Sequence, residues 1–227
     1  MNNAARLAQP GVVAGTVRIS SAEGFGAAFL APLLPTLLKA RPGLRIELAA
    51  LAGFLSASRR EVDIAITLNA PTSTLLAVEP LTRYQLALYA APAYLEAAGA
   101  PTRLEDLRRH SLVGYIDDLI YAPELRYLDE LDSGLRPTVA SASLLAQRAI
   151  IANGGGIGVL PCFMSEGLQR VLADQVLIER RFWMSASSDR SHSAPVRAVR
   201  SWIKDVAAQN KARLCPFEAL GTVAAGA

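Results

Sequence analysis

The sequence predicts an α/β fold, and three observations carry that prediction. Residues 15–51 read as a strand, a helix and a second strand in succession. Residues 144–161 read as a helix that ends at three consecutive glycines and leads into a short apolar strand. The length of 227 residues provides core enough for one large or two small domains. Because β-α-β crossovers are right-handed, we expect the first two strands to be parallel.

Composition restricts the class of protein. Hydrophobic residues make up 52% of the chain and charged residues 19%, which is too apolar for disorder. No apolar run has the length of a membrane span. The net charge of +3 comes from scattered basic residues, so we expect no nucleic-acid surface on this segment. Residues 1–14 lack the features of a secretory signal, and we expect a disordered leader and a cytoplasmic protein.

The sequence contains few of the residues that usually bind metals or build a histidine-based catalytic site. Cys162 and Cys215 are too few for a disulfide framework and lack metal-ligand spacing. His110 and His192 both stand among polar residues. We therefore expect no metal, no cofactor and no histidine-based catalytic triad.

The first half of the chain predicts a series of strands around one long helix. Residues 15–20 alternate in polarity, and apolar residues at helical spacing follow over 25–37. Pro32 and Pro35 interrupt that helix, so it kinks or starts again there. Two more strands are expected at 44–51 and 62–68. Asp63, at a strand start, is expected to accept hydrogen bonds from nearby backbone N–H groups.

The second half predicts short strands and helices. Ser141 or Ser143 is expected to cap the helix that precedes the glycine turn. The turn itself, with Gly154-Gly155-Gly156, is interpreted as a structural connection first and a ligand contact second. The expected strands are 86–89, 112–115, 136–140, 157–160 and 182–185, and the expected helices are 101–107, 144–150, 165–173 and 194–208.

Several different short motifs follow one another in a characteristic order over residues 12–209. They are Gly15–Ile19, Leu30–Leu34, Arg59–Ile66, Tyr89–Leu95, Leu104–Leu107, the glycine turn with Leu160-Pro161, and Pro195–Val199. In order and spacing they resemble the regulatory domain of LysR-type transcriptional regulators. The resemblance implies a type 2 periplasmic-binding-protein-like fold, in which two Rossmann-like subdomains are joined by two crossover strands and bind a small effector between them.

The resemblance also implies an organisation and a set of partners. The first subdomain would be discontinuous, a second subdomain would be inserted in it, and a flexible tail would follow; the ranges are 15–87 with 182–210, 88–181, and 211–227. DNA would be bound by a winged helix-turn-helix domain that this chain lacks. We expect a homodimer, a tetramer in the full-length regulator, and no membrane contact.

The dimer expectation rests on the helix after the first strand, which packs against a partner in the family. Its apolar residues offer more surface than one core face needs, with burial in the chain's own core as the alternative for about half of them. These residues are Phe25, Phe29, Leu33 and Leu37.

Candidate effector contacts in the first subdomain follow strand ends. The loop Ser21-Ala22-Glu23-Gly24 precedes a helix whose N–H groups suit a polar or anionic ligand, and the family uses this loop in its pocket. Glu23 departs from the family pattern and puts a carboxylate effector in doubt. Helix capping alone explains Ser21 and Glu23 equally well. Ala52, Gly53 and Thr67 end the next two strands, and a bond to backbone explains the Thr67 hydroxyl equally well.

Candidate contacts in the second subdomain also follow strand ends. Tyr115, Ile116 and Asp117 form one group, Ser141 and Ser143 a second, and Ile157 and Gly158 stand after the glycine turn. Ser141 and Ser143 are interpreted as caps first and ligand contacts second. The neighbouring carboxylates Asp117 and Asp118 are interpreted as a solvated loop.

Three functions compete on these observations. The leading hypothesis is an effector-sensing domain of a LysR-type regulator. The alternative is a solute-binding protein of a transporter, which shares the fold. An enzyme is the third, but no nucleophile, base and orienting group stand in a recognisable arrangement, so we expect no catalytic residues.

Overall fold

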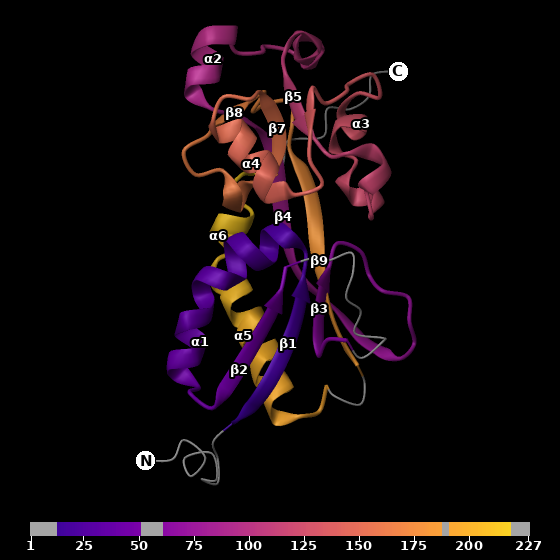
Figure 1. Ribbon diagram of the computed structural model, residues 1–227, viewed down its shortest axis with the longest axis vertical. Helices are drawn as coiled ribbons and strands as arrows, with labels where there is room; N and C mark the ends of the chain where they lie inside the picture. Colours follow the sequence, from indigo (N-terminus) through magenta and orange to yellow (C-terminus); the bar gives the residue numbers. More distant parts are fainter. Residues whose placement is uncertain (1–12, 51–60, 188–190, 219–227) are drawn as a thin grey trace. The chain divides into compact units, whose positions relative to one another are not determined.

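The computed structural model describes residues 13–50, 61–187 and 191–218. The chain forms two compact units (Figure 1). Unit 1 contains the chain up to Thr82 together with Arg181–Asn210, and unit 2 contains Arg83–Arg180 and the chain from Lys211 onward. The chain therefore changes units after residues 82, 180 and 210. The sequence placed the first two changes after residues 87 and 181 and assigned residues 211–227 to neither subdomain.

The sheet of unit 1 is mainly parallel. Strand β1 (Gly15–Ser21) lies between β2 (Leu44–Ala49) and β3 (Ile64–Thr67) and is parallel to both. Strand β9 (Ile178–Ser187) runs antiparallel to β3. The predicted β-α-β unit is confirmed, since β1 and β2 pair in parallel with Val17 opposite Ile46.

The helix after β1 changes its winding twice. It begins as a π-helix, η2 (Phe25–Leu30), continues as a 3₁₀-helix, η3 (Ala31–Leu33), and ends as α1 (Leu34–Ala40). Pro32 lies in the first turn of η3 and Pro35 in the first turn of α1. At these positions a missing N–H group costs no hydrogen bond. The restart predicted at these prolines is confirmed.

Aromatic packing and one long helix close the core of unit 1. The ring of Phe25 stacks on that of Phe29 with centroids 4.8 Å apart, and lies 4.5 Å from the ring of Phe182. Helix α5 (Ala194–Gln209) packs against β1 with its apolar face, and the Ser193 hydroxyl caps it by accepting a hydrogen bond from the Val196 N–H group.

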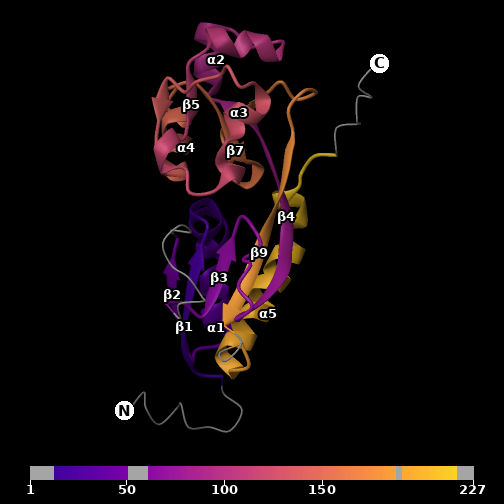
Figure 2. The ribbon, with the colours of Figure 1, turned by 90° about the vertical axis from the view of Figure 1, so that its right-hand side faces the viewer.

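The strands of unit 2 follow the order β4-β7-β5-β6. Strand β4 (Leu76–Ala90) begins in unit 1 and pairs antiparallel with β7 (Ile157–Pro161) and with β8 (Gln169–Val171). Strand β5 (Leu112–Gly114) is parallel to β7 and to β6 (Val139–Ala140). Strands β4 and β9 are hydrogen-bonded neighbours, and both continue from one unit into the other (Figure 2).

Two predictions for unit 2 are wrong. A helix was expected over 165–173, but these residues contain β8, because Gly167 and Leu172 have left-handed backbone (φ +77° and +50°) and β4 offers a pairing edge. The tail expected from residue 211 begins with helix α6 (Lys211–Leu214), which packs on unit 2 with Leu214 fully buried.

Short helices connect the strands of unit 2. Helix α4 (Leu144–Ala152) is capped by Ser143, whose hydroxyl accepts a hydrogen bond from the Ala146 N–H group. Ser143 is one of the two residues predicted as its cap. The remaining helices are α2 (Pro92–Ala98), η4 (Leu104–Arg109), η5 (Asp117–Leu119), η6 (Pro123–Leu125), α3 (Tyr127–Leu131), α4 (Leu144–Ala152) and η7 (Cys162–Met164).

The glycine turn between α4 and β7 is a structural connection, as predicted. Gly154 and Gly156 both have positive φ, +81° and +139°. A Cβ atom added to Gly156 would lie 2.3 Å from the carbonyl oxygen of Ser111, and one added to Gly155 would lie 2.4 Å from Ile150. Only glycine therefore fits at positions 155 and 156 without a shift of the neighbouring residues.

Candidate functional site

The carboxyl end of β1 carries two adjacent buried serines. Ser20 is 2% exposed and Ser21 is fully buried, although both side chains end in a hydroxyl. The Ser21 hydroxyl donates to the carbonyl oxygen of Ala22 at 3.2 Å, and the Ala22 N–H group donates to Ile66 on β3 at 3.0 Å. The predicted loop thus lies at the edge where the parallel strands β1 and β3 both end, the usual ligand position of an open α/β sheet.

The helix that follows begins directly at this edge. Glu23 and Gly24 already have helical backbone, and the Gly26 N–H group donates to Ala22 at 2.9 Å. A Cβ atom at Gly26 would lie 3.0 Å from that of Ala50 and 3.1 Å from that of Ser21, so the absence of a side chain lets the helix approach the strand ends. The partly exposed Glu23 carboxylate stands in the first turn, where the helix dipole favours negative charge.

Two further positions of unit 1 were predicted as contacts. The Thr67 hydroxyl donates to the carbonyl oxygen of Asn69 at 2.7 Å, which is the backbone bond considered as the alternative. Ala52 and Gly53 lie outside the described residues. The expected role of Asp63 is confirmed, since its carboxylate accepts a hydrogen bond from the Arg18 N–H group at 2.8 Å.

In unit 2 the ends of β5 and β6 meet. The Ser141 N–H group donates to Gly114 at 3.0 Å, and the Ser141 hydroxyl accepts from the Ser143 N–H group at 3.2 Å. Gln147, which the sequence did not single out, is 2% exposed and donates from Nε2 to the Ser141 carbonyl oxygen at 2.8 Å. This buried amide fixes the loop before α4.

The residues after β5 differ in exposure. The Tyr115 ring is half-buried and packs on the ring of Tyr127 with centroids 6.1 Å apart, Ile116 is also half-buried, and Asp117 is exposed. Burial raises the pKa of Tyr127 and of Tyr84, so both phenols stay protonated across the physiological range. These groups act as hydrogen-bonding groups and not as bases.

A small cavity lies beneath these residues within unit 2. Its volume is about 30 Å³, with Tyr115, Tyr127, Gln147 and Val159 in its lining. A space of this size accommodates a water molecule but no metabolite. The cavity is therefore not the effector site by itself.

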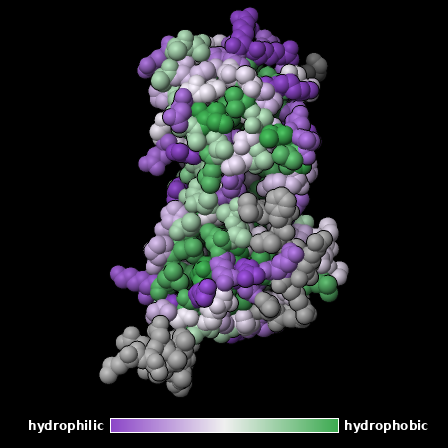
Figure 3. All heavy atoms as spheres, viewed as in Figure 1, coloured by the Kyte–Doolittle hydropathy of each residue, from purple (hydrophilic) through white to green (hydrophobic). Residues whose placement is uncertain are grey.

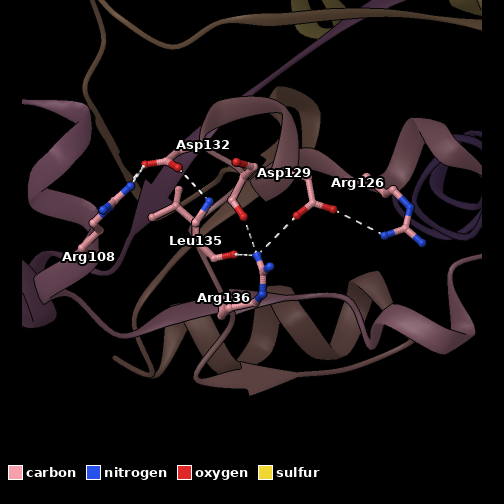
Figure 4. A network of polar contacts seen from close by, with 8 residues as sticks. Arg108, Arg126, Asp129, Asp132, Leu135 and Arg136 are labelled. Carbon is pink, nitrogen blue, oxygen red and sulfur yellow. Dashed lines mark hydrogen bonds and ion pairs between the residues drawn. The ribbon is translucent and has the colours of Figure 1, made fainter.

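An ion-pair network braces the segment around this cavity (Figure 4). The Asp129 carboxylate lies 3.4 Å from the Arg126 guanidinium and 3.6 Å from that of Arg136. Arg108 contacts Asp132 at 2.7 Å, and Asp132 also accepts from the Gly134 N–H group at 2.7 Å. These contacts fix α3 and the chain that follows it.

The two residues after the glycine turn lie inside unit 2. Ile157 is fully buried, and Gly158 is buried in the middle of β7. A Cβ atom at Gly158 would lie 2.6 Å from Ile151 and 2.9 Å from the carbonyl oxygen of Val113. Their local role is close packing between α4, β5 and β7; an effector contact stays a prediction.

The described residues contain neither a group of metal-ligating side chains nor a membrane-spanning helix. No group of three or more histidine, cysteine, aspartate or glutamate residues able to hold a metal ion occurs among them. None of the helices they form combines the length and hydropathy that crossing a membrane requires.

Comparison with known proteins identifies the family. The family model described as the LysR substrate binding domain matches residues 10–208. The chain belongs to this family. A LysR substrate-binding domain of this kind has the type 2 periplasmic-binding-like fold, with two α/β units joined by crossover strands, and the division of the chain agrees with it.

Its relatives are transcriptional regulators. The domain is 27% identical over 198 residues to the Mau operon transcriptional activator of Paracoccus denitrificans, and 27% identical over 192 residues to the HTH-type transcriptional regulator CrgA of Neisseria meningitidis. These alignments cover 86% and 82% of this chain. The chain spans 66% and 60% of the length of those two proteins.

Solved structures agree in fold. The CrgA regulatory domain from Neisseria meningitidis superposes with a TM-score of 0.75 at 22% identity, covering 85% of this chain and 98% of that one. The effector domain of AmpR from Pseudomonas aeruginosa gives 0.69 at 20% identity, with coverage of 88% and 100%.

Proposed function

We propose that this LysR substrate-binding domain senses a small-molecule effector for a transcriptional regulator. The observation that carries the proposal is the buried pair Ser20 and Ser21 at the carboxyl end of β1, which is parallel to both of its neighbours, shortly before a helix N-terminus. Hydroxyl groups and first-turn N–H groups together suit a polar ligand. The regulatory relatives support a sensor over a transporter's solute-binding protein.

The charge at this edge narrows the ligand class. Glu23 places a carboxylate in the first helical turn, where an anionic ligand would otherwise be favoured. A ligand carboxylate there would meet a like charge, so we expect the effector group that contacts unit 1 to be neutral or cationic. In unit 2 we propose Tyr115, Asp117 and Ser141 as contacts, with Ser143 chiefly a cap.

We further propose that the domain acts without catalysis, in the cytoplasm, as part of a longer regulator. DNA would be contacted by a helix-turn-helix domain elsewhere in that protein, and the effector would alter the packing between copies of the sensing domain.

Apolar side chains exposed on α1 and on α4 are candidates for an interface between two copies of the chain. Of the residues predicted for an interface, Phe25, Phe29 and Leu37 lie in the core of unit 1, which corrects that prediction because the π-helix turns both rings inward. Apolar residues gather on the surface over α1 and over α4 (Figure 3). Leu38 on α1 and Leu145 on α4 are 38% and 40% exposed. We propose that these helices form the homodimer.

A thermal-shift screen tests the sensor proposal. Panels of neutral, cationic and anionic metabolites are added to the domain, and a ligand at a hundredfold its dissociation constant should add about 2.7 kcal/mol to stability. Ser21→Ala should reduce the shift, whereas Ser201→Ala, a matched change at an exposed position of α5, should leave it intact. Equal responses of the two variants would overturn the site, and absence of any stabilising compound would count against the function.

A further inference from the structure

A single buried amide joins three segments of the chain. Gln85 on β4 is 1% exposed. Its Nε2 donates to the Oε1 atom of Glu179 at 3.2 Å and to the carbonyl oxygen of Phe217 at 2.9 Å, and its Oε1 accepts from the Phe217 N–H group at 3.0 Å. Both N–H bonds and the oxygen of the amide are therefore engaged.

Gln85 and its two partners all lie in unit 2, each in a segment that adjoins one of the three places where the chain changes units. Gln85 follows the change after Thr82, Glu179 on β9 precedes the change after Arg180, and Phe217 follows the change after Asn210. Arg83 adds an ion pair to Glu179 at 3.8 Å. The amide thus ties the C-terminal segment to both crossover strands at once.

The C-terminal segment is held at other points on unit 2. We call residues 211–218, which comprise α6 and the chain after it, the C-terminal strap. Helix α6 packs against η7, and the Arg170 guanidinium lies 3.9 Å from the centre of the Phe217 ring. Within the strap Leu214 is fully buried, while Phe217 and Cys215 are only half-buried.

The strap buries one apolar side chain, Leu214, completely, and water can replace its two hydrogen bonds to Gln85. Segments near a chain end with little buried apolar surface open at a low free-energy cost. The Gln85 amide, in contrast, loses both of its hydrogen bonds to Phe217 together when the strap leaves or shifts, so the docked and released states are distinct. This is the behaviour of a latch and not of a gradual restraint.

We propose that the C-terminal strap is a releasable third link between the two units, with Gln85 as the positioning residue that latches it to the crossover strands. Two crossover strands alone would permit unit 2 to move as on a hinge, and the docked strap removes part of that freedom. Release of the strap would free the crossover strands, so the latch sets how readily the sensor of the proposed function responds.

The native cysteines provide a direct test. Cys215 lies on the strap and Cys162 in η7 beneath it. In a Cys162→Ser background, the rate at which Ellman's reagent labels Cys215 reports release of the strap. Gln85→Glu removes the donor to Phe217 and places a carboxylate beside Glu179, so labelling should accelerate at least tenfold. Gln169→Glu, a matched change at an exposed position of β8, should leave the rate unchanged.

A second measurement connects the latch to the crossover strands. Hydrogen exchange of the backbone in 82–86 and 178–182 should quicken in Gln85→Glu and, with less risk to folding, in Phe217→Ala. Unchanged labelling and unchanged exchange in Phe217→Ala would overturn the latch. Both readouts need no effector, so failure to find a ligand would leave the latch standing and would count only against sensing.

Discussion

Gly26 lies against Ser21 so closely that a Cβ atom at Gly26 would stand 3.1 Å from the Ser21 Cβ. The missing side chain lets the π-helical turn approach the strand end that carries the buried serine pair. The position of the Ser21 hydroxyl therefore depends on a residue that has no side chain.

Gly26→Ala should separate stability from binding. Alanine gains about 1 kcal/mol of helix propensity over glycine, which offsets the crowding against Ser21 and Ala50, so the melting temperature should change little. Affinity for a compound that stabilises the wild type in the thermal-shift screen should fall several-fold, because Ser21 must move. Gly99→Ala, strained by φ +79° but free of contacts within 4 Å, is the control that should leave affinity unchanged.

The glycine turn offers a graded stability test by urea unfolding. Gly154→Ala should cost about 1 kcal/mol, since φ is +81° but nothing lies within 4 Å of the added Cβ. Gly156→Ala should cost about 3 kcal/mol or more, because the added Cβ also meets the Ser111 carbonyl oxygen. Equal losses of stability in the two variants would contradict this account of the turn.

Glu79 should make stability depend on acid pH. Burial raises its pKa, but hydrogen bonds from Lys204 at 2.8 Å and from Arg200 at 2.6 Å outweigh burial, so the folded-state pKa lies below 4.5. The stabilisation is present above pH 4.5 and is lost as pH falls through the folded pKa. Glu79→Gln should cost about 1 kcal/mol at pH 7, and this cost should shrink as the pH is lowered below 4.5. Glu96→Gln, on the exposed face of α2, should show no such convergence in urea unfolding.

Oligomeric state should respond to the apolar areas over α1 and α4. Leu38→Glu and Leu145→Glu each place a charge in the proposed dimer contact and should shift the molar mass in light scattering from dimer towards monomer. Leu119→Glu, at a 55% exposed leucine of unit 2 outside both helices, should leave the mass unchanged. A wild type that is monomeric at 100 µM would refute the dimer.

Local chemistry made much of the fold predictable. The alternation of residues 15–20 identified β1, the prolines marked where the first helix restarts, and glycines with positive φ stood where a left-handed turn was expected. The helix predicted over 165–173 was wrong although the apolar spacing there suits a helix. The pairing of β8 with β4 joins residues about 80 positions apart, and local spacing does not reveal such a contact.

The candidate site was predictable only in part. Ser21 and Ser141 lie at the carboxyl ends of β1 and β6, as the strand patterns predicted. Their contact with an effector stays a prediction. The alternation of residues along β7 did not predict which neighbours surround Gly158. In the structure Ile151 and Val113 fill the space beside it. Gln147 and Gln85 were missed because residue type alone does not predict which backbone groups a buried glutamine amide will contact, here those of Ser141 and Phe217.

Because the chain changes units three times, the two ends of the described chain belong to different units. Val13 and β1 belong to unit 1, whereas the exposed Glu218 belongs to unit 2. A donor dye at the first position and an acceptor dye at the second would therefore report the distance between the units by energy transfer. A protein fused to the amino end is carried by unit 1, and one fused to the carboxyl end is carried by unit 2.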